Sequence, residues 1–297
     1  MKDFNIISSI TAPQIRKITE YIGNKVHSTL KENAEKTYDN IIELSQKDYT
    51  IISGTTMVIE FDGSMIRHLV EKGTEWKELK LGCIFIKNQI GRVIQKEYIS
   101  YSGTAEEFKK ILFHLAVEMK YMQMERIQII ADGAHWIWNI CKELFPNAIE
   151  VLDYYHCKEN VFEYYNEVYR DDKEKATNEA NKIMKKIERE VKIETILKQI
   201  PELEIIPQGI VNLKSYLDYH KDRIKYKTIK KLKLDIGSGV IESGNKNVIQ
   251  HRMKQTGMQW KGENVNAIAS LRCKNFSFKW EDVKNEIHKL FSVPQYA

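Results

Sequence analysis

Three acidic residues lie in segments that are otherwise apolar or rich in glycine, and they are the strongest candidates for chemistry in this chain. Asp62 lies in IEFDGSMI, Asp132 in IIADGAHW and Glu242 in GSGVIESGNK. In the first two segments, strand-forming residues precede the acid and a glycine follows it. We therefore expect a short acid where a strand stops and the chain turns. Carboxylates placed in this way face a common cleft.

Carboxylates gathered at one edge of a sheet repel one another unless a cation lies between them. Oxygen ligands suit Mg²⁺ or Mn²⁺, and two such ions about 4 Å apart can activate water or a 3′-hydroxyl for in-line displacement at a phosphodiester. We expect two such ions, held by Asp62, Asp132 and Glu242. The structural alternative is that each Asp-Gly pair is a turn and that Glu242 is a solvated helix residue.

A second acid and a histidine occur together in LDYYHCKEN. Asp153 and His156 form a D-x-x-H step just after a predicted strand, where both side chains can face the same cleft. The imidazole could contact a phosphate or act near the scissile bond. The residues alone favour a structural interpretation, with Asp153 as a helix N-cap and His156 half-buried.

Basic residues concentrate in the C-terminal third, although the net charge of +5 is mild and says little by itself. They lie in the run KDRIKYKTIKKLK (221–233) and between 246 and 279, where aromatic residues alternate with them. Cations for phosphates and aromatic rings for bases are typical of nucleic-acid binding, although a solvated helix surface gives a similar pattern. Trp260 could stack on a base or seal a helix end against the sheet. The candidate DNA-binding residues are Lys246, Arg252, Lys254, Trp260, Lys261 and Arg272.

Composition excludes several other classes of protein. With 297 residues, 42% of them hydrophobic, the chain can form one large or two small domains. It has neither the run of ~20 apolar residues that a membrane helix needs nor a secretory leader. We expect a soluble protein of the cytoplasm, associated with the nucleoid and not with a membrane. The four cysteines form no CxxC pair, so we expect reduced, mostly buried thiols.

The periodicity of apolar residues predicts the elements that position the acids. Residues 1–50 read as helices, with one segment that Thr11 can cap and a second over 29–46. Strands are predicted over 55–61, 77–87 and 92–101, joined as an antiparallel meander. A helix, a strand ending at Asp132, another helix, a strand ending at Asp153 and further helices follow. The predicted order is β-β-β-α-β-α-β-α, an α/β sheet covered on its faces.

That chain order is typical of the ribonuclease-H-like fold, in which one acid lies on the first strand, the next at the end of the fourth and the last on a later helix. We expect an all-α insertion before Glu242, with a break at 201–209. The predicted divisions are a helical N-terminal segment (1–50), a ribonuclease-H-like core (51–160), the helical insertion (161–236) and a C-terminal helical part of the core that carries Glu242 (237–297).

Two long segments and one short one give the chain a resemblance to a known family. They are ADGAHWIWNICKELFPNAIEVLDYYHCKENV (131–161), IGSGVIESGNKNVIQHRMKQTGMQWKGENVNAIASLR (236–272) and, more weakly, FDGSMI (61–66). Over about residues 55–275 the chain resembles DDE-type insertion-sequence transposases of the ISKra type, relatives of the Mutator-like group. The resemblance implies a ribonuclease-H-like core with Asp62, Asp132 and Glu242 as the acidic triad, and with Asp153 and His156 as an accessory D-x-x-H pair.

Enzymes of this kind cut double-stranded DNA at element ends and join the freed 3′-hydroxyl to a target. Because two ends must be held together, the resemblance implies a homodimer or larger assembly. Family members carry a sizeable N-terminal region that recognises the terminal repeats, whereas here Ser8–Val26 resembles only the last helix of a helix-turn-helix. The sequence thus predicts an N-terminally truncated transposase. The alternatives are a nuclease of the same fold and an inactive copy that only binds DNA.

Overall fold

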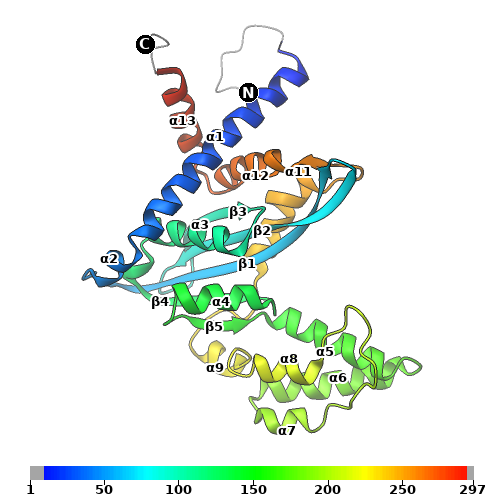
Figure 1. Ribbon diagram of the computed structural model, residues 1–297. Coiled ribbons are helices and arrows are strands. Elements are labelled where there is room, and N and C mark those ends of the chain that lie inside the picture. The colour runs from blue at the N-terminus through cyan, green and yellow to red at the C-terminus, as the bar shows by residue number, and fades with distance from the viewer. Residues whose placement is uncertain (1–9, 293–297) are drawn as a thin grey trace.

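A mixed sheet lies at the centre of the computed structural model, which describes residues 10–292 (Figure 1). Its strands follow the spatial order β3-β2-β1-β4-β5, and the short β6 pairs with β1. β1 pairs with β2, and β2 with β3, in antiparallel fashion, while β1, β4 and β5 run parallel. The strands are β1 (Ile52–Val70), β2 (Gly73–Lys87), β3 (Val93–Tyr101), β4 (Met124–Ala131), β5 (Ile149–Leu152) and β6 (Trp260–Lys261).

From β1 to α5 the elements follow the order β-β-β-α-β-α-β-α, which confirms the predicted order, with one 3₁₀ turn (η1, Tyr121–Gln123) before β4. The helices are α1 (Ala12–Asp39), α2 (Ile41–Gln46), α3 (Ala105–Glu118), α4 (His135–Leu144), α5 (Tyr154–Val168), α6 (Lys173–Glu188), α7 (Ile193–Leu197), α8 (Leu213–Tyr219), α9 (Tyr226–Lys231), α10 (Gly239–Gly244), the π-helix η2 (Asn245–Gln250), α11 (His251–Met253), α12 (Gly262–Phe276) and α13 (Trp280–Ser292).

The first strand is longer than predicted. We expected it to stop at Asp62, but β1 continues to Val70 and pairs with β2 as far as Gly73. Beyond Asp62 the buried residues alternate with more exposed ones, because one face of this hairpin still packs against the protein. The expectation of a turn after Asp62 is therefore wrong: Asp62 lies inside a strand.

Helices cover both faces of the sheet. Successive side chains of a strand point to opposite faces. Phe61 of β1 meets Phe108 of α3 and Trp136 of α4, with ring centroids 6.3 Å and 6.4 Å apart. On the other face, α10 and η2 contact β1, and α12 contacts β3. Within residues 10–292 no helix combines the length and apolar character needed to span a membrane.

The first helix is continuous where two were predicted. α1 runs for 28 residues and ends at Asp39, because the face that carries buried Val26 and His27 continues through Leu30 to Ala34. Residues 8 and 9, which the sequence included in a helix-turn-helix remnant, lie outside the described residues.

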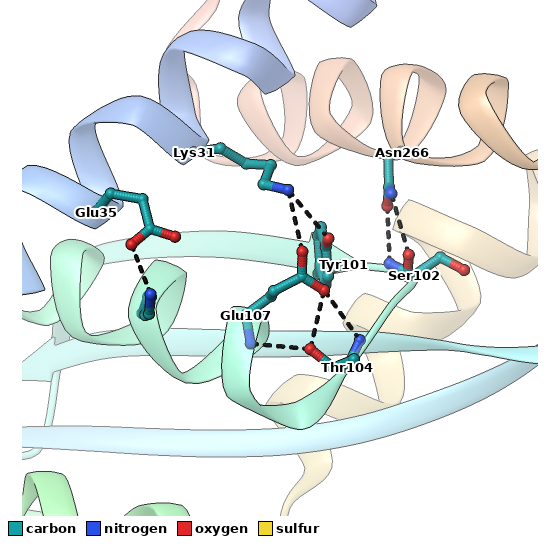
Figure 2. A network of polar contacts seen from close by, with 8 residues as sticks. Lys31, Glu35, Tyr101, Ser102, Thr104, Glu107 and Asn266 are labelled. Atoms are coloured by element: carbon teal, nitrogen blue, oxygen red, sulfur yellow. Dashed lines mark hydrogen bonds and ion pairs between the residues drawn. The ribbon is translucent and has the colours of Figure 1, made fainter.

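Polar contacts fix α1 to the rest of the fold, as Figure 2 shows. The Lys31 ammonium donates to the Tyr101 hydroxyl at 3.4 Å and pairs with Glu107 at 3.1 Å. Glu35, one turn further along, pairs with Lys110 of α3 at 2.6 Å. Because α1 also packs against α12, it contacts a helix on each face of the sheet. It is therefore one of the helices that cover the sheet.

The segment 161–236 contains helices joined by turns, as the predicted all-α insertion requires. An irregular stretch over 201–212 coincides with the predicted break at 201–209. Tyr226, at the start of α9, is buried and donates its hydroxyl to the Leu152 carbonyl at 3.1 Å. This bond ties α9 to the end of β5, next to Asp153.

Candidate functional site

Asp62 and Asp132 lie at the same level of neighbouring parallel strands. The last paired residues of β1 and β4 are Glu60 and Ile130, and each aspartate comes two residues later. Residues at one level of parallel strands point to the same face. Burial raises the pKa of Asp62, and the nearby charge of Asp132 acts in the same direction. The structure therefore brings two of the three predicted acids together.

Asp132 follows the last residue of β4, so its predicted place at a strand end is confirmed. Its Oδ1 accepts a hydrogen bond from the Ala134 N–H at 2.9 Å, which orders the turn into α4. Gly133 allows a close approach here, because a Cβ atom would lie 2.6 Å from the Tyr216 ring of α8. At this Asp-Gly pair the chain turns into α4, and Gly133 lies close to α8 of the helical segment 161–236.

Two residues that sequence reasoning missed hold Asp62 in place. Asn245, the first residue of η2, donates from Nδ2 to the Asp62 carboxylate. The Ser64 hydroxyl donates to Oδ1 of the same amide at 2.7 Å, which fixes which end of the amide faces Asp62. Ser64 and Asn245 are both buried, so this arrangement is shielded from water.

Glu60 attaches the helix that carries Glu242. Its Oε2 accepts a hydrogen bond from the Ile241 N–H at 2.7 Å, at the first turn of α10. Burial raises the pKa of Glu60 to about 8, and the charges of Asp235 and Asp153 add to this effect. The only sign of this role in the sequence is that Glu60 stands between two apolar residues of a strand.

Glu60, Asp62 and Ser64 are alternate residues of β1, so their side chains leave the same face. All three bond to the α10–η2 segment. A glycine lets that segment come close to the sheet, because a Cβ atom on Gly244 would lie 2.5 Å from the Tyr98 ring of β3. One face of β1 therefore sets the position of the segment that carries Glu242.

Asp153 is fully buried and acts as the N-cap of α5, as the residues alone indicated. Its Oδ1 accepts hydrogen bonds from the backbone N–H groups of Tyr155 and His156, at 2.7 Å and 2.9 Å. Its Oδ2 accepts from the backbone N–H and the hydroxyl of Ser238, just before α10. Asp153 thus joins the starts of α5 and α10 and has no access to solvent.

His156 and Glu242 line one open hollow on the surface, with a volume of about 330 Å³. Burial raises the pKa of Asp62, and the charge of His156 is among the smaller effects that oppose this rise. Its side chain is 43% exposed, and Nδ1 lies 3.7 Å from the Glu159 carboxylate. Tyr155, Lys158, Glu159 and Phe162 complete the lining.

The expected three-acid metal site stays a prediction. Across residues 10–292, no three His, Cys, Asp or Glu side chains lie close enough together to hold an ion. Asp62 is turned toward Asn245, Oδ1 of Asp132 is bonded to Ala134, and Glu242 lies on the side of the hollow. The carboxylate oxygens of the three acids suit Mg²⁺ or Mn²⁺ as donors.

The candidate DNA-binding residues divide into exposed and structural ones. Trp260 pairs with β1 through β6 and donates from Nε1 to the Met253 carbonyl at 2.9 Å, with Arg252 5.2 Å from its ring centroid. These contacts favour the sealing interpretation of Trp260. The guanidinium of Arg272 donates to two backbone carbonyls of η2, which fixes the side chain against that segment, and its contact with DNA stays a prediction. The exposed members of the set are Lys246, Arg252, Lys254 and Lys261.

The protein is a mixed α/β protein with a pair of aspartates at one edge of its sheet. The central strand β1 holds the neighbouring helix α10 in place. The chain belongs to the uncharacterised protein family UPF0236, whose model matches residues 53–287. This family is associated with transposase-like proteins.

No curated protein matches the chain. Among solved structures, the match to the crystal structure of NurA with manganese has 13% identity and a TM-score of 0.13. It covers 95% of this chain, which spans 65% of the length of that one. A likeness this weak carries no argument about fold or function.

Proposed function

We propose that this protein is a DDE-type transposase of the ISKra type, which cuts double-stranded DNA at insertion-sequence ends and joins the freed 3′-hydroxyl to a target. The observation that carries the proposal is the placement of Asp62 and Asp132 at one level of adjacent parallel strands, beside the helix of Glu242. Membership of a family associated with transposase-like proteins supports the same conclusion.

A ribonuclease-H-like core is the fold assignment that goes with this function. The chain order from β1 to α5 supports it, as do the acids on the first and fourth strands. The exposed basic residues near η2 and β6 would face DNA, and a homodimer or larger assembly would hold two ends together at the nucleoid in the cytoplasm.

Asp62, Asp132 and Glu242 are the residues that would hold Mg²⁺ or Mn²⁺. Such an ion, when bound, would activate the attacking oxygen and stabilise the leaving oxygen of the phosphodiester. The protein itself contributes orientation: Asn245 holds the carboxylate of Asp62, and Glu60 holds the first turn of α10. His156 presents a partly exposed imidazole that can contact a phosphate or exchange a proton.

Cleavage and joining of labelled duplexes with candidate element ends, in Mg²⁺, in Mn²⁺ and in chelator, tests the proposal. Asp132→Asn keeps an acceptor for the Ala134 N–H but removes the charge, so we expect loss of both reactions. Asp48→Asn, at an exposed aspartate after α2, is the matched control and should retain activity. Metal-dependent cutting without joining would indicate a nuclease of the same fold, and binding without cutting an inactive DNA-binding copy.

A further inference from the structure

An exposed basic cleft lies between the C-terminal end of α6 and the short helix α9. It has a volume of about 510 Å³ and contains the cations of Arg189, Lys227, Lys230 and Lys231. All four of these residues are exposed. The described ion pairs in this part of the chain engage other lysines, Lys182 and Lys225 among them. The four cations form none of the described ion pairs, although Lys227 and Lys231 lie near enough to Glu190 for their charges to act on it.

The two acids beside these cations are occupied by other groups. Glu188, which also lines the cleft, accepts a hydrogen bond from the Tyr154 hydroxyl at 2.5 Å. Glu190 accepts from the Thr228 backbone N–H at 2.6 Å and from its hydroxyl at 2.8 Å. These bonds fix the positions of both carboxylates, and the four cations still outnumber the two acids, so the cleft keeps a positive excess.

An aromatic bridge connects the cleft to the hollow of His156 and Glu242. Lys230 lies 5.9 Å from the ring centroid of Tyr154. That ring packs edge-on against Tyr155, with centroids 5.4 Å apart. Tyr155 is 63% exposed and lines the hollow. The hollow that Glu242 lines is thus connected to the basic cleft through the rings of Tyr155 and Tyr154.

We propose that this cleft binds the phosphate backbone of the DNA that leaves the acidic site, with Arg189 and the α9 lysines on phosphates and Tyr155 against a base. Cations spaced along a groove with an adjacent exposed aromatic ring are what a nucleic-acid strand requires. The inference rests on the proposed function, since it takes DNA as the substrate. It makes the helical insertion a DNA-binding part of the enzyme.

Fluorescence anisotropy of a short labelled duplex across a salt series tests this inference. The cleft variant combines Lys227→Gln, Lys230→Gln and Lys231→Gln. The matched control neutralises three exposed lysines that lie outside both the cleft and the helix-turn-helix-like segment: Lys36→Gln, Lys120→Gln and Lys142→Gln. Both variants lose the same net charge, and thermal melting monitored by circular dichroism checks that both remain folded.

We expect the cleft variant to bind at least about tenfold more weakly at low salt and to lose about 2 to 3 from the slope of log K against log salt, while the control keeps the wild-type slope. Equal behaviour of the two variants would overturn the inference and leave the proposed function intact. A wild-type protein that binds no duplex, at any salt concentration, would contradict both.

Acetylation of lysines, followed by mass spectrometry with and without the duplex, gives a second readout on the unaltered protein. The α9 lysines should be protected by DNA, and Lys36, Lys120 and Lys142 should not. Equal modification of the α9 lysines in both conditions would overturn the inference.

Discussion

Replacing His27 by glutamine is expected to make the protein less sensitive to mild acid. His27 lies on α1, is only 9% exposed, and its Nδ1 lies 3.1 Å from the Ser270 hydroxyl of α12. Its ring stacks on Tyr101 of β3, with centroids 5.7 Å apart. The pKa of His27 is lowered to about 4, mainly by burial and also by the charge of Lys31, while the charge of Glu107 of α3 opposes this.

The direction of the effect follows from the lowered pKa. A histidine that is neutral when folded and protonates more readily when unfolded contributes stability that is complete above pH ~6.5 and is lost as the pH falls toward 4. A difference of about 2.5 pKa units at 1.36 kcal/mol per unit amounts to roughly 3 kcal/mol. Glutamine keeps a polar group near Ser270 and is not protonated in this pH range. The variant His27→Gln should therefore avoid roughly 3 kcal/mol of the stability that the wild type loses on acidification.

Urea unfolding of the two proteins at several pH values between 7 and 4 measures this difference. His251→Gln, an exposed histidine of α11, is the control and should leave the pH dependence unchanged. His220, the C-cap residue after α8, whose pKa is also lowered to about 4 chiefly by burial, should account for a similar residual loss. If His27→Gln lost as much stability as the wild type on acidification, the assignment of this loss to the α1 interface would be wrong.

Two further substitutions test the attachment of the α10–η2 segment. Asn245→Ala removes the donor that orients Asp62 and should lower metal-dependent cleavage about 10- to 100-fold. Asn247→Ala, at a half-buried residue of the same π-helix whose amide donates to Ser243, should leave the cleavage rate nearly unchanged, and equal rates for the two variants would refute the orienting role. Gly244→Ala should destabilise the fold by about 1 to 3 kcal/mol in thermal unfolding, because its new Cβ meets the Tyr98 ring. Gly239→Ala in α10 has open space and should be neutral or slightly stabilising, so equal effects at the two glycines would contradict the close approach.

Local patterns in the sequence predicted the order of elements and the end of β4 at Asp132. They failed at Asp62, because Gly63 and Ser64 are turn-forming residues in isolation and become strand only through pairing with β2. They also missed Asn245, because its partners lie more than 180 residues away in the chain. The N-cap role of Asp153 needed only its near neighbours and was predicted correctly.

Composition does not show that the side chains of Trp260 and Arg272 form hydrogen bonds within the protein. Both read as cationic or aromatic DNA contacts because they lie in a polar, basic stretch. The structure bonds Trp260 to Met253 and Arg272 to carbonyls of η2. Backbone acceptors at helix ends capture long polar side chains, and only the folded chain shows where those acceptors lie.

The central claim is that Asp62 and Asp132 act as one catalytic site. The measurement that tests it most directly is the rate of Mn²⁺-dependent nicking of supercoiled plasmid by Asp62→Asn, Asp132→Asn and the double variant. Residues of one catalytic unit are strongly non-additive. We expect each single variant to lose about 1,000-fold or more and the double variant to be no slower than either. Wild-type rates in the single variants, or losses that multiply in the double variant, would contradict a shared site.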